Sequence, residues 1–431
     1  MSGNWANRKL RDLAEIRVSN VDKKVHASEK PVKLCNYMDV YSNEYVTSSL
    51  PFMEASATAA EIERFGLNKG DVIITKDSET PDDIGIPAVV MERIGNLVCG
   101  YHLALIRPIM EGLDSVYLAK QLSTERVARY FALHASGSTR YGLPISAIEA
   151  VEIPTPPKPE QAKIAEILST VDRAIEQTEA LIAKQQRIKT GLMQDLLTRG
   201  IDEHGNLRSE ETHQFKDSPL GMIPVEWEVN KLGNYISYLS YGFTNPMPTA
   251  GEGPYMVTAA NISGGAIQHD GCRRTTFEAY ENLLTNKSRP KMGDILLTKD
   301  GTLGRIAIVD RVPLCINQSV AVLRPKRGVD NGYLKLLLES PECQERLLAD
   351  AGGSTIKHLY ISKIDKMPIP VPPDSEEQKA IKKQLSVYTE LISRGSQQLR
   401  KLRALKTALM QDLLTGKKRV SLLLEAEGLI S

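Results

Sequence analysis

The feature that most constrains the fold of this 431-residue chain is an internal repeat, because the second half of the sequence resembles the first. When the sequence is compared with itself, matched blocks occur at an offset near 217 residues. The block GDVIITKD at 70–77 recurs as GDILLTKD at 293–300, and LALIRP at 103–108 recurs as VAVLRP at 320–325. Two copies of so long a repeat do not suit a solenoid. They predict a duplicated molecule with a pseudo-two-fold internal repeat.

Later matches keep the same order in each half. They are Gly137-Ser-Thr139 with Gly353-Ser-Thr355, IPTPP at 153–157 with IPVPP at 369–373, and LMQDLLT at 192–198 with the same heptapeptide at 409–415. The starts also correspond, since Trp5 and Leu10 match Trp227 and Leu232. Each half therefore consists of one globular part followed by one helical part.

The composition is that of a folded protein, with 42% hydrophobic and 25% charged residues. No apolar run approaches the roughly 18 to 20 residues of a membrane span, and the N-terminus carries charge where a secretory signal is apolar, which predicts a cytoplasmic protein. Five widely separated cysteines allow no local disulfide framework or CxxC knuckle. Because the net charge is only +1, any binding to nucleic acid must come from local patches.

Short runs rich in β-branched residues and leucine predict buried strands. These runs are 72–75 and 295–298, each after a Gly-Asp turn, and 103–106, 306–309 and 320–323. A helical stretch follows in each half, at 116–134 and at 331–350. The globular parts are therefore expected to be α/β or mixed α+β domains, in two copies.

Proline clusters end each globular part. They comprise Pro154, Pro156, Pro157 and Pro159 in the first half, and Pro368, Pro370, Pro372 and Pro373 in the second. Proline cannot continue a sheet or a helix interior, so each cluster predicts a stiff extended exit.

After each cluster, apolar or small side chains recur at alternating steps of four and three, from Ile164 to Leu196 and from Ile381 to Leu413. Either each long helix packs on its own globular part, or the two helices pair as an antiparallel coiled coil. A seam kept over about four heptads exceeds what a surface helix needs and favours pairing. Gly200 is a C-cap signal for the first helix.

These signals divide the chain into six parts. They are a first globular domain at 1–157, a first helix at 158–200, a polar linker at 201–222, a second globular domain at 223–373, a second helix at 374–416 and a C-terminal tail at 417–431. The tail has no sequence match in the first half.

Motifs for enzymatic chemistry are missing. The chain contains no GxxxxGK[ST] phosphate loop, no GxGxxG after a strand and no HExxH pair. The histidines form no triad beside a GxSxG nucleophile. The chain itself is therefore predicted to be non-catalytic.

The duplicated combination of Gly-Asp-x-hydrophobic-x-Thr, the Gly-Ser-Thr loop, Ile-Pro-x-Pro-Pro with Glu-Gln, and the heptad helix resembles the specificity subunit of Type I restriction-modification enzymes. One departure is that the first half lacks the Ile-Pro-x-x-Trp lead-in at 223–227. The resemblance implies two target recognition domains, each binding one half of a bipartite double-stranded DNA site, and paired helices that set the spacer. It also implies two modification (methyltransferase) subunits that bind S-adenosylmethionine, and restriction subunits that use ATP and magnesium. No cofactor is expected on this chain.

Candidate DNA contacts are donors on the repeated loops and strand ends. In the first half they are Thr75, Lys76, Ser138, Thr139, Arg140 and Tyr141, and in the second half Thr298, Lys299, Arg305, Ser354, Thr355, Lys357 and His358. Residues shared by both halves suit phosphates, whereas the unshared Tyr241, Arg273 and Arg274 suit base edges. The alternative is that these loops are solvated turns whose hydroxyls cap helices. The basic run at 417–419 either touches the DNA spacer or is a solvated tail.

Two other classes of function stay open at this point. A duplicated adaptor could hold protein partners on its helices without binding DNA, and an enzyme could use an unfamiliar site. Binding of DNA that weakens steeply with salt separates the first reading from the adaptor.

Overall fold

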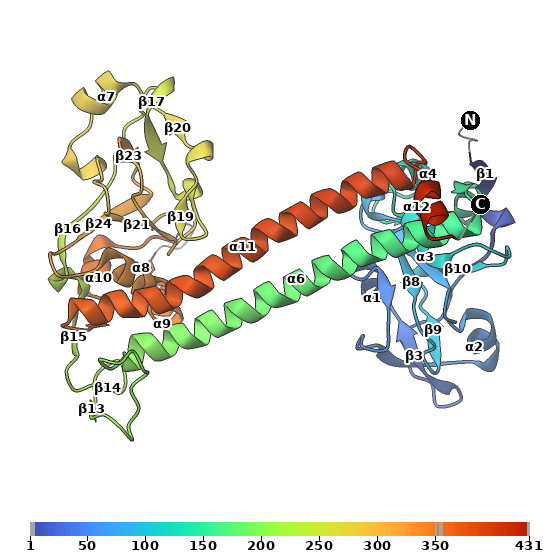
Figure 1. The fold of residues 1–431 in the computed structure, drawn as a ribbon, viewed down its shortest axis with the longest axis horizontal. Coiled ribbons are helices and arrows are strands. Elements are labelled where there is room, and N and C mark those ends of the chain that lie inside the picture. Colours follow the sequence, from blue (N-terminus) through green and yellow to red (C-terminus); the bar gives the residue numbers. More distant parts are fainter. Residues whose placement is uncertain (1–4, 350, 353–356, 429–431) are drawn as a thin grey trace. The chain divides into compact units, whose positions relative to one another are not determined.

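The computed structural model describes residues 5–349, 351–352 and 357–428, and the chain separates into two compact units. Unit 1 comprises Met1–Glu179 with Gln397–Ser431, and unit 2 comprises Ala180–Ser396. Two long helices, α6 (Lys158–Arg199) and α11 (Ser375–Leu413), are each divided between the units. Each unit therefore joins a mixed α/β part to one segment of each long helix (Figure 1).

The globular part of unit 1 is built on two sheets. The five-stranded sheet has the order β2 (Ala14–Val18), β10 (Leu103–Pro108), β6 (Val72–Thr75), β8 (Pro87–Val90) and β4 (Tyr45–Val46), and the three-stranded sheet has the order β5 (Met53–Ala57), β3 (Lys30–Cys35) and β9 (Leu97–Cys99). The helices are α1 (Tyr37–Tyr41), α2 (Ala59–Phe65), α3 (Ser115–Leu122), α4 (Glu125–His134) and α5 (Ile145–Ala150). Strand β6 is buried at every position, because sheet and helices cover both of its faces.

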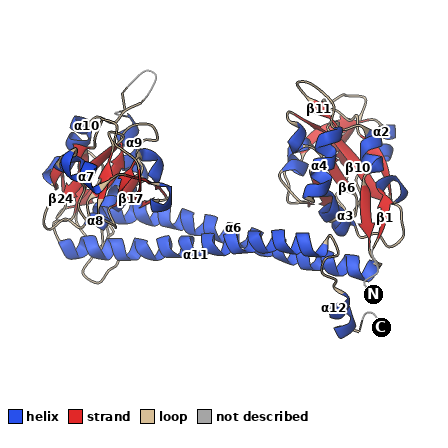
Figure 2. Cartoon of the chain, turned by 90° about the horizontal axis from the view of Figure 1, so that it is seen from above, coloured by secondary structure: helices blue, strands red, loops and turns tan. Residues whose placement is uncertain are grey.

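Unit 2 repeats this topology, except that its larger sheet has four strands and not five. Its larger sheet has the order β16 (Ile236–Tyr241), β24 (Val320–Pro325), β21 (Ile295–Thr298) and β22 (Ile306–Ile308), and its second sheet has the order β20 (Arg273–Arg274), β17 (Ala250–Val257) and β23 (Leu314–Ile316). In both second sheets the central strand pairs antiparallel with one neighbour and parallel with the other. The expected internal repeat of mixed α/β domains is confirmed (Figure 2).

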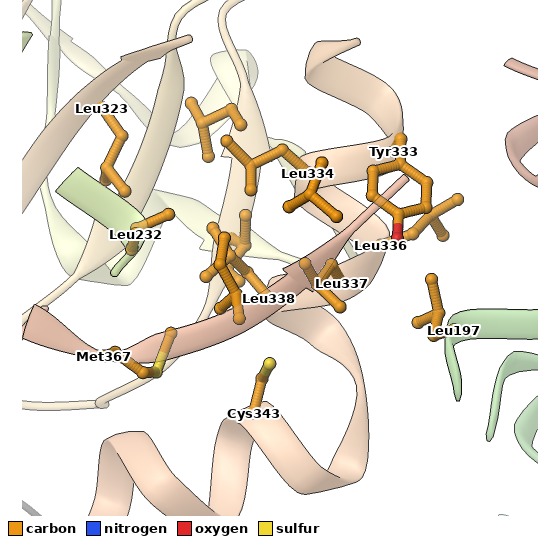
Figure 3. Packing of buried hydrophobic residues seen from close by; sticks show 14 of the residues in the cluster. Leu197, Leu232, Leu323, Tyr333, Leu334, Leu336, Leu337, Leu338, Cys343 and Met367 are labelled. Atoms are coloured by element: carbon orange, nitrogen blue, oxygen red, sulfur yellow. The ribbon is translucent and has the colours of Figure 1, made fainter. Parts of the chain in front are cut away.

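Unit 2 has further, short elements outside these sheets. They include β13 (Phe215–Lys216), β14 (Ile223–Pro224), β18 (Ile262–Ser263), β19 (Ala266–Ile267), α7 (Phe277–Asn282), α8 (Asn331–Glu339), α9 (Pro341–Ala349) and α10 (Ile361–Lys366). Helix α8 supplies much of the core, with Leu334, Leu337 and Leu338 packed against the sheet (Figure 3).

Each helical stretch expected after the second buried strand is confirmed and is made of two helices. In unit 2 the break falls at Ser340, because Pro341 has no amide hydrogen and begins a new helix. In unit 1 it falls between α3 and α4, where the hydroxyl of Thr124 donates to the carbonyl of Gln121.

The proline clusters also differ from expectation, since each begins inside a short strand. Strand β12 (Glu152–Thr155) pairs with β1 (Ala6–Lys9), and β25 (Pro368–Val371) pairs with β15 (Glu228–Lys231). Each pair is a separate two-stranded ladder, so both strands are edges, and an edge strand tolerates proline where its missing amide has no partner to lose.

The long helices pair within each unit, and they run antiparallel. In unit 1, Asp172 Oδ1 of α6 lies 2.7 Å from Lys406 Nζ of α11. Glu179 comes later on α6, and its Oε1 lies 2.6 Å from Nη2 of Arg403, which comes earlier on α11. In unit 2 the helices approach so closely that a Cβ on Gly395 would lie 2.8 Å from Ile182. The coiled-coil alternative is therefore confirmed within both units.

A buried ion network joins the helix pair of unit 1 to the globular part. The carboxylate of Asp172 accepts hydrogen bonds from Lys120 of α3 at 2.5 Å and from Tyr45 of β4 at 2.7 Å, besides its contact with Lys406. Glu44 also pairs with both lysines. Burial favours the neutral form of Asp172, but these partners outweigh burial and hold the pKa of the carboxyl below its ordinary value.

A buried carboxylate also closes unit 2. Glu377, in the first turn of α11, accepts hydrogen bonds from the indole nitrogen of Trp227 at 3.2 Å and from the amide of Ile201 at 3.0 Å. The guanidinium of Arg208 pairs with both of its oxygens. One carboxylate thus ties the segment after α6 to the start of α11.

Unit 1 has the corresponding closure, made by the segment after α11. Glu160, in the first turn of α6, pairs with Arg419, whose guanidinium lies 5.2 Å from the ring centroid of Trp5. Leu424 of α12 (Ser421–Ala426) is buried beside them. The C-terminal segment, which has no match by sequence, is therefore the structural counterpart of the segment after α6.

Candidate DNA interface

The two threonines at the strand ends are structural. Thr75 ends β6 and Thr298 ends β21, and both are fully buried. The hydroxyl of Thr75 accepts a hydrogen bond from the amide of Ile86, and that of Thr298 accepts one from the amide of Arg305, each at 2.9 Å. Because each hydroxyl is spent on holding the following turn, we assign both threonines this role and not the predicted contact with DNA.

In unit 1 the Gly-Ser-Thr loop lies against the end of β6. Strand β11 (Tyr141–Gly142) pairs with β7 (Asp77–Ser78), and the amide of Leu143 donates to the carbonyl of Lys76 at 2.8 Å. Gly137 has a φ of +146°, and a Cβ there would lie 1.8 Å from the carbonyl oxygen of Arg140, so only glycine fits this turn.

The predicted side chains of this loop are accessible. Ser138, Thr139 and Arg140 are exposed, and Tyr141 is half-buried. The fold therefore brings Lys76 and the loop, which are far apart in sequence, to one place on unit 1.

Unit 2 makes the same junction. The amide of Leu359 donates to the carbonyl of Lys299 at 2.9 Å, and His358 forms bridges with Asp300 and Gly352. Lys357 is exposed and His358 is half-buried. The predicted contacts Ser354 and Thr355 lie outside the described residues.

Sequence reasoning missed an aspartate at the centre of each junction. Asp77 accepts hydrogen bonds from Lys76 Nζ at 2.7 Å and from His102 Nδ1 at 2.9 Å. Burial favours the neutral form of Asp77, but the hydrogen bonds from Lys76 and His102 outweigh it and hold the pKa of the carboxyl below its ordinary value.

The second aspartate makes the same contacts in unit 2. Asp300 accepts from Lys299 Nζ at 2.7 Å and contacts His358 Nδ1 at 2.7 Å. We call these two groups, Lys76–Asp77–His102 and Lys299–Asp300–His358, the Lys–Asp–His clusters. The signal for them was present in the sequence, because the aspartate closes the repeated block in both halves.

Tyr241 lies beside the cluster of unit 2. This residue ends β16, and its half-exposed ring has Lys299 Nζ at 5.3 Å and Lys287 Nζ at 5.7 Å from the centroid. An aromatic ring close to two lysines offers an apolar surface for a base edge and cations for phosphates.

The remaining predicted arginines lie in two other places. Arg305 is exposed at the start of β22, and its guanidinium donates to the carbonyl of Ile262 at 3.1 Å. Arg273 and Arg274 form β20, in the second sheet of unit 2, where the guanidinium of Arg274 stacks 4.5 Å from the ring centroid of Tyr255. No contact joins these two arginines to the described residues of the Lys–Asp–His cluster.

A groove of about 510 Å³ in unit 1 begins at the cluster. Its lining includes Asp77, His102 and Arg140, together with Tyr37 and Tyr41, whose rings are stacked with centroids 5.4 Å apart. Burial raises the pKa of Tyr37, and a hydrogen bond to Asp83 raises that of Tyr41, so both hydroxyls stay protonated at neutral pH. The groove thus offers donors, acceptors and aromatic faces together.

In the described ranges, no three His, Cys, Asp or Glu side chains gather as they would around a metal ion. No helix there combines the length and the apolar character needed to cross a bilayer.

Both halves of the chain match one family model, that of the Type I restriction modification DNA specificity domain, over residues 2–185 and 224–402. The chain belongs to this family. The match to both halves agrees with the duplicated topology and the duplicated junction described above.

Particular relatives extend over nearly the whole chain. The chain is 26% identical over 424 residues to a protein of Methanocaldococcus jannaschii described as the type I restriction enzyme MjaX specificity subunit, covering 96% of this chain and 94% of that one. It is 24% identical over 423 residues to the type I restriction enzyme MjaVIII specificity subunit of the same organism, covering 95% and 93%.

Solved structures share the fold. The Type-I restriction-modification system S subunit from M. genitalium superposes with a TM-score of 0.59 at 16% identity, over 96% of each chain. A chain solved in work on complex assembly and conformational transition of the type I R-M system gives a TM-score of 0.54 at 16% identity, over 96% of this chain and 98% of that one.

Proposed function

We propose that this chain is the DNA sequence-recognition subunit of a Type I restriction-modification enzyme. Each globular domain binds one half of a bipartite double-stranded DNA site, and the base pairs between the halves are not contacted specifically. The observation that carries the proposal is that the same strand end and Lys–Asp–His cluster recur in both units of a chain whose halves both match the specificity domain.

In this proposal residues 1–157 and 223–373 are the two target recognition domains. Residues 158–200 and 374–416 are the spacer helices, 201–222 is the linker and 417–431 is the tail. The helices fix the unread spacer and present a surface for two modification (methyltransferase) subunits. Because its target is DNA, the complex acts in the cytoplasm.

The chain contributes recognition and not catalysis. Methyl transfer from S-adenosylmethionine belongs to the modification subunits, and ATP-driven and magnesium-dependent steps belong to restriction subunits where these join. The sequence supports this division because it carries none of the phosphate-loop or nucleophile motifs that such reactions use.

The contacts with DNA divide into two kinds. Lys76, Lys299, Ser138 and Thr139 hold phosphates, because the same residue types recur in both halves of the sequence. Arg140 adds a cation to the same exposed loop. Tyr241 and the Tyr37–Tyr41 pair, which the two units do not share, contact bases. Arg273, Arg274 and Arg305 extend the surface of unit 2, and Lys357 and His358 complete its loop.

Selection from a randomised duplex library tests the function. The chain is purified with its modification subunits, bound duplexes are sequenced, and binding of the enriched duplex is titrated at several salt concentrations. We expect two fixed half-sites separated by a spacer of constant length, and an affinity that falls steeply with salt. An adaptor would form the protein complex but enrich no sequence, and that outcome would refute the proposal.

A further inference from the structure

The two Lys–Asp–His clusters reach the same arrangement by different routes. Lysine and aspartate come from the repeated block in both units, but the histidines do not correspond. His102 precedes β10, and its carbonyl accepts from the amide of Lys76 at 2.9 Å; in unit 2 that place belongs to Ser319, whose carbonyl accepts from the amide of Lys299 at 2.8 Å. Duplication alone would have left the histidine at the same position, so the recurrence of the trio points to a shared task.

The second histidine stands where unit 1 has a glycine. His358 bridges to Asp300, as Gly142 bridges to Asp77. The histidine of each cluster therefore comes from a different position in the fold. The contact between histidine Nδ1 and the carboxylate is nevertheless the same, at 2.9 Å for His102 and 2.7 Å for His358.

The hydrogen bonds leave each cluster with unused contacts. An ammonium has three donors; Lys76 spends two on Asp77, and Lys299 spends one on Asp300 and one on the carbonyl of Gln318. The Nε2 atoms of His102 and His358 have no partner among the residues that the structure describes. Each carboxylate thus fixes one ammonium and one imidazole and leaves a polar edge of both for another molecule.

The charge of the clusters argues for a geometric role. A carboxylate repels phosphate, and within each cluster it cancels the charge of the lysine, so the cluster adds little net attraction for DNA. The side chains of Lys76 and Lys299 are only 19% and 15% exposed, so each is held in one orientation and does not move freely in solvent. A held donor loses less conformational entropy on binding than a free one.

We infer that Asp77 and Asp300 are positioning residues, each of which holds a lysine and a histidine in the orientation that contacts the DNA half-site. This inference rests on the proposed function. The change in DNA affinity expected on removing either aspartate is opposite in sign to that expected from charge alone. Removing a negative charge beside phosphate should tighten binding, whereas removing a positioning residue should weaken it.

The test uses the full chain in complex with its modification subunits and a fluorescent duplex carrying the bipartite site that the wild-type complex selects. Affinity is measured by anisotropy for Asp77→Asn, Asp300→Asn and Lys76→Met, and for the double variant of Lys76→Met with Asp77→Asn. The matched control is Asp82→Asn, the same chemical change at an exposed residue nearby that holds no cation. Thermal unfolding of each variant checks that it is folded.

We expect Asp77→Asn and Asp300→Asn each to weaken binding about tenfold, and Asp82→Asn to stay within about twofold of wild type. In the Lys76→Met background Asp77→Asn should cost less affinity than in the wild-type background, because only the hold on His102 is left to lose. If the wild-type complex binds the duplex and both Asn variants bind it as well or more tightly, or if the Asp77 loss is fully additive with the Lys76 loss, the inference is wrong. If the wild-type complex selects no duplex, the proposed function fails first, and the inference falls with it.

Discussion

Replacing Glu377 by alanine should destabilise unit 2 severely. The change leaves the indole nitrogen of Trp227 and the amide of Ile201 without an acceptor, and leaves the guanidinium of Arg208, whose side chain is only 12% exposed, without its carboxylate. An unsatisfied buried donor costs about 1 to 3 kcal/mol, and breaking one side of a buried ion pair costs about 3 to 5 kcal/mol. These terms overlap because they share one carboxylate, so we expect a total loss of about 3 to 5 kcal/mol.

Fluorescence can follow this loss in unit 2 alone. The chain has only two tryptophans, so a Trp5→Phe background leaves Trp227 as the single reporter, in direct contact with the altered site. For a unit of this size 1 kcal/mol shifts the melting temperature by about 2 to 4 °C, which predicts a decrease of about 6 to 20 °C.

The neighbouring residue provides the control. The side chain of Glu376 is 74% exposed and, among the described residues, pairs only with Lys379 on the surface, so Glu376→Ala should cost at most about 1 kcal/mol. A loss for Glu377→Ala no larger than that of Glu376→Ala would refute the reasoning that this carboxylate closes unit 2.

Three further predictions concern the helix pair and acid stability. Asp172→Ala should lower the stability of unit 1 by about 3 kcal/mol, measured by calorimetry, because it leaves the buried Lys120 without its buried carboxylate partner. The exposed Glu176→Ala should have little effect in the same measurement. Because the pKa of Asp172 is lower in the folded state than in the unfolded one, its contribution is complete above about pH 5 and is lost as the pH falls through the folded pKa; urea unfolding against pH should show a decline that is smaller in Asp172→Asn, and equal declines would contradict this assignment. Insertion of four residues into both long helices adds about 6 Å to each and should lengthen the unread DNA spacer by about one to two base pairs. A methylated motif with an unchanged spacer would contradict the proposal that the length of the helices sets the spacer.

Much of the fold could be predicted from the sequence because its signals are local and are given twice. Strands 72–75 and 295–298 are continuous apolar runs after a Gly-Asp turn, and the structure has strands β6 and β21 at those residues. The heptad spacing of the long helices likewise depends only on residues a few positions apart. Where a local rule has an exception that depends on neighbours, prediction failed, as for the prolines in β12 and β25, which are allowed because those strands are edges.

The site was harder to predict because its residues meet through sheet register. His102 reaches Asp77 only because β10 pairs with β6 so that Leu103 lies opposite Thr75, and a single sequence does not specify that register. Thr75 illustrates the converse error. A hydroxyl at a strand end resembles an exposed donor, yet the chain returns at Gly85 and Ile86 and buries it.

Mapping methylated bases tests most directly whether this chain supplies the sequence specificity of a methylating complex. Genomic DNA is compared from cells that carry the modification subunits with this chain, without it, and with this chain alone. We predict methylation at one two-part motif with a constant spacer, present only when chain and modification subunits are together. A methylation pattern that is the same with and without this chain would contradict the account.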